Sequence, residues 1–425
     1  MRTGVMRQGI IAAALLAQAA IPVCALAASP EQTAAAALKA APVWDGHNDV
    51  PEQLRERRKD VIADFDFRDT TGTADPANER TAMHTDLTRL RQGQVGAQFW
   101  SVYVSTDLTD QQAVQATLEQ IDVTKRLIAR YSQDLVLCTT AAQVERAMKA
   151  GRIASLLGIE GGHSIGGSLA VLRQMHELGA RYMTLTHFKN TSWADAATDA
   201  PKHGGLTDHG RDVVREMQRI GMLVDLSHVS AETMRDALEV AKGPVIFSHS
   251  GALALNGHPR NVPDDVLTRL KANGGIVMVD FAPDYVSEEV RTWSAARKAE
   301  AARNDAYYIG NPEGAKKANA DWLAAHPTPK ATLAQAADHI DHVVKLAGID
   351  HVGLGGDFDG LGSLPTGLED VSTYPALFTE LARRGYSSVD LQKIASRNMM
   401  RVMKAAEAYT AAHRSDPPIE APTTF

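Results

Sequence analysis

Residues 207–249, TDHGRDVVREMQRIGMLVDLSHVSAETMRDALEVAKGPVIFSH, contain two successive units of a helix followed by a strand. In the first unit, Asp208 is expected to cap a helix that Gly221 ends. The apolar residues of that helix recur at the spacing of one helical face, and they are Val213, Val214, Met217 and Ile220. The next apolar run predicts a strand that reaches His228, and the second unit ends in a strand at His249. Repeated units of this kind are typical of α/β folds with parallel sheets.

The same pattern extends over most of the chain as eight short apolar runs that end in polar residues. The eight predicted strands are 43–47, 98–103, 154–160, 182–187, 222–228, 244–249, 276–281 and 351–357. Continuous apolar strands of this length imply parallel strands that are covered on both faces. Eight of them favour an α/β fold of the (β/α)8 TIM-barrel type over a doubly wound sheet. Residues 287–333, rich in Ala, Lys, Arg and Glu, interrupt this rhythm and predict a helical insertion between strands 7 and 8.

The composition is that of a globular protein, with 44% hydrophobic and 22% charged residues in a chain of 425. A formal net charge of -7 disfavours nucleic acid or an anionic membrane as the main partner. Aromatic residues make up only 5%, which disfavours a surface that stacks on carbohydrate or on single-stranded nucleic acid. Composition and charge therefore argue against nucleic acid, anionic membranes and carbohydrate as the main partners, but they do not indicate a function.

The first 27 residues predict a secretory signal peptide. Two arginines precede the apolar stretch Ile10–Val23, and Ala25-Leu26-Ala27 matches the A-x-A pattern of a cleavage site. The apolar stretch is shorter than the ~20 residues that a membrane span needs. We therefore expect an exported protein, periplasmic or secreted, without a membrane anchor. The mature chain is expected to form one domain over residues 28–415, followed by a flexible tail over residues 416–425.

The carboxyl ends of the predicted strands carry a set of histidines and carboxylates. In a parallel barrel these ends converge on one face, where the active sites of such barrels form. Six of the eight ends contribute His47 with Asp49, Glu160, His187, His228, His249 and Asp357. A single histidine at a strand end is more often structural, but six polar ends at one mouth predict an active site.

These side chains have the chemistry of a two-metal hydrolase centre. His47 and Asp49 are two residues apart, so on an extended segment both point to the same side and can grip one cation. His228 and His249, on adjacent strands, are suited to a second cation, and Glu160 can offer one oxygen to each. Nitrogen and oxygen ligands without thiolates favour zinc, with manganese and cobalt as alternatives. Such a centre lowers the pKa of its water to about 7, so a metal-bridging water is the expected nucleophile.

Two further strand-end residues are candidates for catalysis. Asp357 is suited to take the proton of the bridging water and pass it to the departing amine. The alternatives are that Asp357 is a further metal ligand, or that it orders a glycine-rich turn together with Asp359. His187 is suited to donate a hydrogen bond to the scissile carbonyl, and the alternative is a third ligand for one ion.

Arg260 follows the sixth strand and is suited to clamp a substrate carboxylate with both arms of its guanidinium group. The alternative is an ion pair with Asp264 or Asp265 at the start of the next helix. Surface positions are expected for three histidines around a later predicted helix, which are His339, His342 and His351.

Eight segments, taken in order, resemble the membrane (renal-type) dipeptidase family of zinc peptidases, within the amidohydrolase-like barrels. They are DGHNDVP (45–51), GQVGAQFW (93–100), GIEGGHS (158–164), LTH (185–187), DLSHVS (225–230), PVIFSHS (244–250), RNVPDD (260–265) and GGDFDG (355–360). The similarity covers nearly the whole mature chain. The His-x-Asp pair and the bridging glutamate follow the dipeptidase version of the site rather than the commoner His-x-His with a modified lysine.

The resemblance implies two zinc ions per chain, with Glu160 shared between them. The His47–Asp49 pair would complete one site, and the two histidines of the fifth and sixth strands would complete the other. The resemblance further implies that His187 and Arg260 contact substrate, and it adds Tyr285 as a substrate-side residue. Asp357 would handle the proton.

The family hydrolyses dipeptides and tolerates D-residues at their C-terminal position, and some members open β-lactams. Its vertebrate members carry a disulfide and a lipid-anchor tail. Here Thr106 and Lys189 stand near the positions of those cysteines, and no anchor signal is found. Membrane attachment and covalent dimerisation are therefore not expected, while a homodimer without a disulfide is compatible with the resemblance.

We predict an exported binuclear-zinc dipeptidase that acts on small dipeptides. The alternatives are a related metal-dependent amide or lactam hydrolase, and a periplasmic binding protein that retains the site without turnover.

Overall fold

The computed structural model describes residues 1, 3, 4, 28–78 and 80–421, so the predicted signal peptide lies almost wholly outside the described residues. Eight parallel strands form a closed ring, because β1 pairs with β2 on one side and with β9 on the other. In ring order they are β1 Val43–Asn48, β2 Val95–Tyr103, β4 Ile153–Glu160, β5 Ala180–Thr184, β6 Leu223–Asp225, β7 Ile246–Phe247, β8 Ile276–Val279 and β9 Val352–Leu354. Each predicted strand overlaps one of these eight, which confirms the (β/α)8 barrel.

A ninth short strand, β3 Leu135–Leu137, was not predicted. It pairs in parallel with the first residues of β4, from Leu135 opposite Ile153 to Leu137 opposite Ser155. The later residues of β4 pair with β5 instead. A run of only three residues contains too little periodicity to be recognised as a strand in the sequence.

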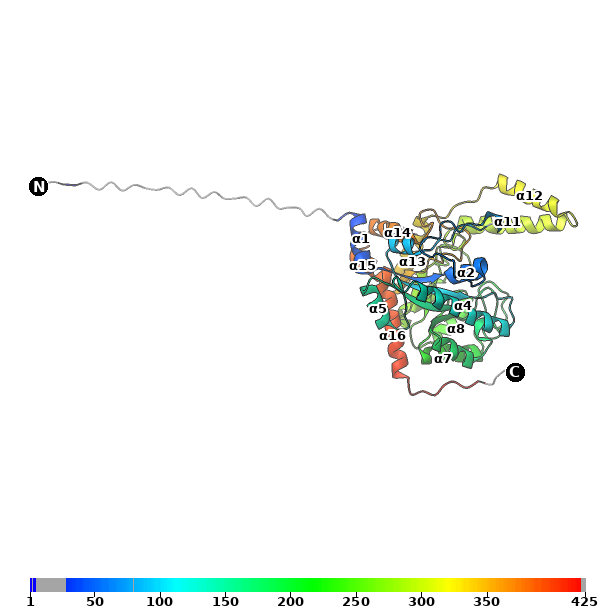
Figure 1. The fold of residues 1–425 in the computed structure, drawn as a ribbon, viewed down its shortest axis with the longest axis horizontal. Coiled ribbons are helices and arrows are strands. Elements are labelled where there is room, and N and C mark those ends of the chain that lie inside the picture. Colours follow the sequence, from blue (N-terminus) through cyan, green and yellow to red (C-terminus); the bar gives the residue numbers. More distant parts are fainter. Residues whose placement is uncertain (2, 5–27, 79, 422–425) are drawn as a thin grey trace.

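Helices separate the strands along the chain and cover the barrel (Figure 1). Up to β7 they are α1 Pro30–Ala40, α2 Val50–Arg58, α3 Leu87–Gln92, α4 Asp110–Arg130, α5 Ala141–Lys149, α6 Leu169–Glu177, α7 Asp208–Ile220 and α8 Ala231–Val240. Later in the chain they are α9 Asp264–Asn273, α10 Pro283–Val286, α11 Glu288–Tyr307, α12 Pro312–Ala325, α13 Leu333–Ala347, α14 Tyr374–Arg383, α15 Ser388–Gln392 and α16 Asn398–Ala412. Helices α11 and α12 lie between β8 and β9, which confirms the predicted insertion, and they project from the body of the barrel in Figure 1.

The cap of α7 differs from the prediction. The side chain of Thr207, not that of Asp208, accepts a hydrogen bond from the backbone N–H of Gly210. Thr207 has the extended backbone of a capping residue, whereas Asp208 is the first helical residue, where its charge interacts favourably with the helix dipole. Gly221 ends the helix as predicted, with a φ of 87° that favours glycine.

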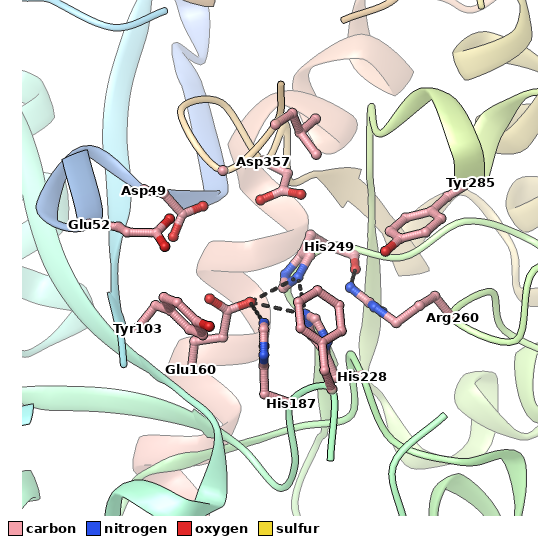
Figure 2. Close-up of a pocket in the computed structure, with 13 residues that line it drawn as sticks. Asp49, Glu52, Tyr103, Glu160, His187, His228, His249, Arg260, Tyr285 and Asp357 are labelled. Carbon is pink, nitrogen blue, oxygen red and sulfur yellow. Dashed lines mark hydrogen bonds and ion pairs between the residues drawn. The ribbon is translucent and has the colours of Figure 1, made fainter. Parts of the chain in front are cut away.

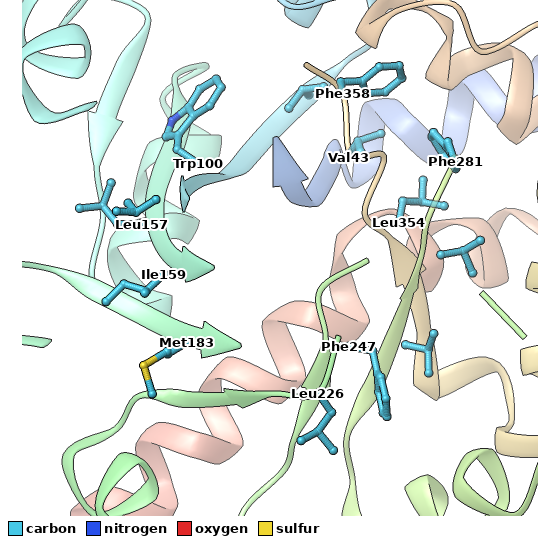
Figure 3. Packing of buried hydrophobic residues seen from close by; sticks show 14 of the residues in the cluster. Val43, Trp100, Leu157, Ile159, Met183, Leu226, Phe247, Phe281, Leu354 and Phe358 are labelled. Carbon is cyan, nitrogen blue, oxygen red and sulfur yellow. The ribbon is translucent and has the colours of Figure 1, made fainter. Parts of the chain in front are cut away.

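The core consists of side chains on both faces of the barrel strands. All eight residues of β4 are buried, as expected for a strand covered on both sides. Neighbouring residues of one strand belong to different hydrophobic clusters: Val43 packs in one with Leu157 and Phe247, whereas Trp44 packs in the other with Leu156. This alternation follows from the period of two in a strand. Figure 3 shows part of the first cluster, including Val43, Leu157 and Phe247.

The described part of the C-terminal tail is attached to the barrel at Ile419. Its backbone N–H donates to Glu216 at 3.2 Å, and Arg173 donates to its carbonyl oxygen at 3.3 Å. These contacts were not anticipated, and the flexibility of residues 416–425 stays a prediction. Within the described ranges, no helix is both long enough and apolar enough to span a bilayer.

Candidate active site

The predicted site residues meet at the carboxyl ends of the strands. Eight of the nine line one cavity of about 140 Å³ (Figure 2), and these are Asp49, Glu160, His187, His228, His249, Arg260, Tyr285 and Asp357. The ninth, His47, is fully buried beside the cavity, with its Nε2 atom 3.4 Å from Oε1 of Glu160. The barrel thus brings together residues that are more than three hundred positions apart in the chain.

Glu160, the last residue of β4, lies at the centre of this cluster. Its Oε1 atom is 3.0 Å from Nε2 of His228 and 3.4 Å from Nε2 of His249. Nε2 of His187 is 3.5 Å from the same oxygen. The hydroxyl of Ser101 donates to the other carboxylate oxygen at 3.1 Å. Burial alone would raise the pKa of Glu160, but the neighbouring histidines, His47 and His187 among them, hold it well below its usual value.

Two hydroxyl groups orient the histidine rings. The hydroxyl of Tyr182 lies 2.9 Å from Nδ1 of His47, and that of Ser248 lies 2.8 Å from Nδ1 of His249. These contacts direct both Nε2 atoms toward Glu160, as outer-shell partners direct metal-bound histidines. Neither hydroxyl partner was predicted from the sequence. Tyr182 is 135 positions away from His47, so only the tertiary structure reveals their contact.

The donor set fits a metal centre. The Nε2 atoms of His228 and His249 are only 3.0 Å apart, and burial lowers the pKa of both rings well below the usual value, so both are neutral. Nε2 of His47 and Oδ1 of Asp49 are buried without a hydrogen-bond partner in the described chain. Buried polar atoms of this kind are costly unless something satisfies them. A cation would do so, because imidazole nitrogens and carboxylate oxygens are metal ligands in their deprotonated forms.

Three overlapping groups of side chains place one ligand atom each within 4.8 Å of one another. They are His47–Glu160–His249, Glu160–His187–His228 and His47–Asp49–Asp357. The predicted ligands all occur in these groups. His187 and Asp357 occur as well, so the geometry also admits the alternative in which either of them is a ligand.

Asp357 follows β9 and faces the cavity from the loop over the barrel mouth. Its Oδ1 atom is 3.8 Å from Nε2 of His47, and its φ of 55° is unusual for a residue other than glycine. Burial raises the pKa of Asp357 well above its usual value, and the carboxylates of Asp280 and Asp49 add to this shift. A carboxyl group in such surroundings is suited to hold a proton.

Arg260 is buried and faces the cavity from the loop after β7. Only 1% of its surface is exposed. Its guanidinium group donates to Ser250 at 3.4 Å and to the carbonyl oxygen of His249 at 3.3 Å. Its Cζ atom lies 5.2 Å from the centre of the Tyr285 ring, which places these two predicted substrate-side residues together.

Among the described residues, Arg260 does not form the alternative ion pair with Asp264 or Asp265, because both of these carboxylates have other partners. Asp264 contacts Nε2 of His342 at 2.8 Å. Asp265 pairs with Arg235 at 2.8 Å. The positive charge of Arg260 therefore remains available to the cavity.

Five residues that line the cavity were not predicted as site residues. They are Glu52 in the first turn of α2, Tyr103 at the end of β2, Phe188 beside His187, and Gly360 and Leu361 in the loop after β9. Each is close to a predicted strand end, and this proximity was the available signal. Burial raises the pKa of Glu52 well above its usual value, and repulsion from the carboxylates of Asp49 and Glu160 adds to the shift.

The loop that carries Asp357 is held by Asp359. The backbone N–H of His84 donates to Oδ1 of Asp359 at 2.7 Å, and the N–H of Asp359 donates to Nδ1 of His84 at 3.0 Å. Gln53 donates to the carbonyl oxygen of Asp359 at 2.7 Å. Of the two aspartates in GGDFDG, Asp359 therefore orders the turn while Asp357 faces the cavity.

Gly360→Ala is expected to lower kcat/KM by roughly a hundredfold, the cost of displacing reacting groups by about 1 Å. A Cβ atom there would lie 2.4 Å from Oδ2 of Asp49 and 2.7 Å from Oδ1 of Asp357. Gly362→Ala is the matched control, because nothing lies within 4 Å of its Cβ position. The measurement is steady-state hydrolysis of a dipeptide by both variants. Equal activity of the two would contradict the crowding around Gly360.

The prediction that His339, His342 and His351 lie at the surface is wrong for two of them. His339 is fully buried, accepting from the N–H of Ala252 at 2.8 Å. His351 is buried against the carbonyl oxygen of Gly275 at 2.8 Å. Both have backbone partners that the sequence does not reveal, and neither lines the cavity.

The comparisons with known proteins agree with this arrangement. The model of the membrane dipeptidase family (peptidase family M19) matches residues 31–416. The probable dipeptidase PvdM from Pseudomonas aeruginosa shares 22% identity over 89% of this chain and 99% of its own, with a TM-score of 0.75. A metallopeptidase from Rhodobacter sphaeroides, solved with a phosphinate mimic of the dipeptide L-Ala-D-Ala, shares 24% identity over 86% of this chain and 99% of its own, with a TM-score of 0.69.

The structural likenesses, at these identities, show a shared fold, whereas the family match covers nearly the whole chain and confirms the resemblance found in the sequence. The barrel and the cluster around Glu160 agree with that assignment. The chain therefore belongs to the membrane dipeptidase family, peptidase family M19, and is a metallo-dipeptidase.

Proposed function

We propose that this protein is an exported dipeptidase whose active site holds two divalent metal ions, most suitably zinc. The observation that carries the proposal is the position of Glu160, whose Oε1 atom lies within 3.5 Å of four histidine nitrogens. Oxygen and nitrogen ligands without thiolates suit zinc. Export is supported by the signal-peptide pattern of residues 1–27, with residues 28–415 as a single mature domain.

In this proposal His47, Asp49 and Glu160 would hold one ion, and Glu160, His228 and His249 would hold the other. When bound, the ions would lower the pKa of water and stabilise the negative charge that develops on the scissile carbonyl oxygen. The hydroxyl partners of His47 and His249 would keep both rings in position for this role.

The remaining residues handle the proton and the substrate. Asp357 accepts the proton released when water attacks the carbonyl carbon, and returns it to the departing amine as the C–N bond breaks. His187 donates a hydrogen bond to the carbonyl oxygen as its negative charge grows. Arg260, beside Tyr285, binds the carboxylate at the C-terminal end of the dipeptide.

The proposal includes substrates with a C-terminal D-residue. The Rhodobacter sphaeroides metallopeptidase was solved with a mimic of L-Ala-D-Ala, which supports the inclusion of this class here. In the proposed orientation, recognition of the C-terminal end depends on the carboxylate contact with Arg260, and a carboxylate is common to both stereoisomers.

Treatment with a chelator is expected to abolish hydrolysis of a panel of L,L- and L,D-dipeptides, and zinc is expected to restore it. For a favoured substrate, amidation of the C-terminal carboxylate should lower kcat/KM by about ten- to a hundredfold, because a charge-assisted hydrogen bond to Arg260 is lost. Metal content per chain is measured alongside. Zinc-loaded protein that cleaves no dipeptide would contradict the proposal.

The same experiment separates the two alternatives. A metal-dependent amide or lactam hydrolase would cleave the dipeptide and its amide equally well, because carboxylate recognition would not matter. A binding protein without turnover would retain metal and remain inert toward the whole panel. The cavity-facing position of Asp357 favours catalysis over binding alone.

A further inference from the structure

The active-site cavity has walls of opposite charge. Arg260 and Tyr285 lie on one side, and Asp49 and Glu52 lie on the other (Figure 2). Asp49 belongs to the proposed metal centre, whereas Glu52 has no part in the mechanism described above. Glu52 is therefore an acidic side chain on the cavity wall without an assigned role.

Glu52 does not have the structural role that its position suggests. It occupies the third position of α2, where a glutamate often accepts a hydrogen bond from the backbone N–H of the capping residue. Here the capping residue is Asp49, and its N–H donates to the carbonyl oxygen of Phe358 at 2.9 Å. No side chain caps this helix. The carboxylate of Glu52 is therefore free to face the cavity.

Within residues 28–78 and 80–421, the side chain of Glu52 forms no hydrogen bond and no ion pair. The next acidic residue of α2 behaves differently. Glu56, one helical turn further on, is paired with Arg80 at 3.0 Å and does not line the cavity. One glutamate of this helix is thus paired with an arginine, while the other presents to the cavity a carboxyl group that has no partner among the described residues.

We propose that Glu52 is a specificity determinant that binds a positively charged nitrogen of the substrate's N-terminal residue. This inference rests on the proposed function. With the C-terminal carboxylate at Arg260, the N-terminal residue of a dipeptide would extend toward the opposite wall, where Glu52 lies (Figure 2). An ammonium group beside Glu52 would form a charge-assisted hydrogen bond and offset the repulsion among the carboxylates there.

Two nitrogens of a substrate have this chemistry, the α-amine and a side-chain amine. A groove of about 280 Å³ adjoins the cavity and shares Glu52, Gly360 and Leu361 with it. A long side chain of the N-terminal residue can therefore leave the cavity past Glu52. To distinguish the two nitrogens, each is tested with a pair of substrates that differ only in that nitrogen.

The test compares Glu52→Gln with wild type on two matched pairs of substrates. Alanyl-alanine and propionyl-alanine differ only in the α-amine, and 6-aminohexanoyl-alanine and hexanoyl-alanine differ only in the distal amine. The quantity measured is kcat/KM, or the competitive inhibition constant for a compound that turns over too slowly. Glu56→Gln, on the same helix but outside the cavity, is the matched control for the first pair. Because Glu56 lines the adjoining groove, Glu177→Gln at the exposed end of α6 is the control for the second pair.

In Glu52→Gln, the preference for the amine-bearing member of a pair is expected to fall by about ten- to a hundredfold. A fall in the first pair identifies the α-amine as the recognised nitrogen, and a fall in the second identifies the side-chain amine. The member without nitrogen should change by less than about threefold. Glu56→Gln should leave the first ratio unchanged, and Glu177→Gln should leave the second unchanged. Metal content should equal that of wild type.

The inference is overturned if Glu52→Gln leaves both ratios unchanged, or lowers kcat/KM equally for all four compounds. Loss of metal in this variant would also overturn it, because Glu52 would then act through the neighbouring metal ligands. Wild-type protein that cleaves no dipeptide would instead refute the proposed function. The two failures are therefore distinguishable.

Discussion

Glu160→Gln is expected to cause the largest loss of activity, on the order of a thousandfold or more in kcat/KM, together with loss of bound metal. Glutamine has nearly the same shape but no charge, and it cannot present two equivalent anionic oxygens to two cations. In the folded protein, Oε1 of Glu160 is the atom on which His47, His228 and His249 converge. Both proposed ions would therefore lose a ligand at once.

The measurement is metal per chain by elemental analysis, alongside hydrolysis of a dipeptide. Glu177→Gln, at the exposed end of α6, is the matched control for the same chemical change and should behave as wild type. Circular dichroism of both variants checks the fold. A Glu160→Gln variant that retains two metal ions and full activity would contradict the shared-ligand role.

Asp357→Asn is expected to lower kcat by about a hundred- to ten-thousandfold while metal content stays at the wild-type value. The amide cannot accept the proton of the attacking water, although it fills the same space. Asp359→Asn is the matched control two residues away in the same loop. Its amide oxygen can still accept the hydrogen bond from the N–H of His84, so we expect a loss of less than about tenfold.

Metal analysis of Asp357→Asn decides between the two roles that the geometry allows for Asp357. Retained metal with lost turnover supports proton transfer. Loss of metal would show that Asp357 is a ligand, as its place beside His47 and Asp49 also permits. Equal losses in Asp357→Asn and Asp359→Asn would mean that both residues merely order the loop.

The positions of the strands were predictable because burial on both faces produces an apolar run that is visible in the sequence. The ligand types were predictable for a related reason: a polar residue at the end of such a run marks the barrel mouth. His47, Glu160, His228 and His249 were identified in this way. The cap of α7 was misassigned by one residue, because Thr207 and Asp208 are both favourable caps and only the backbone conformation separates them.

Contacts between distant segments were not predictable. His339 and His351 are buried because backbone groups of Ala252 and Gly275 satisfy their rings, and nothing near them in sequence indicates this. The contact between Tyr182 and His47 is of the same kind. Glu52 has a helical position that usually serves capping, and only the fold shows that its carboxylate faces the cavity.

The sequence by itself therefore determined the barrel, its helical insertion and the set of histidines and carboxylates at the barrel mouth. These features follow from local periodicity and from residue chemistry, and both can be identified in the amino-acid sequence. The tertiary structure alone decided which partner each charged group takes. Asp265 and Asp264 take partners on α8 and α13 instead of Arg260, and such a choice depends on how distant helices pack.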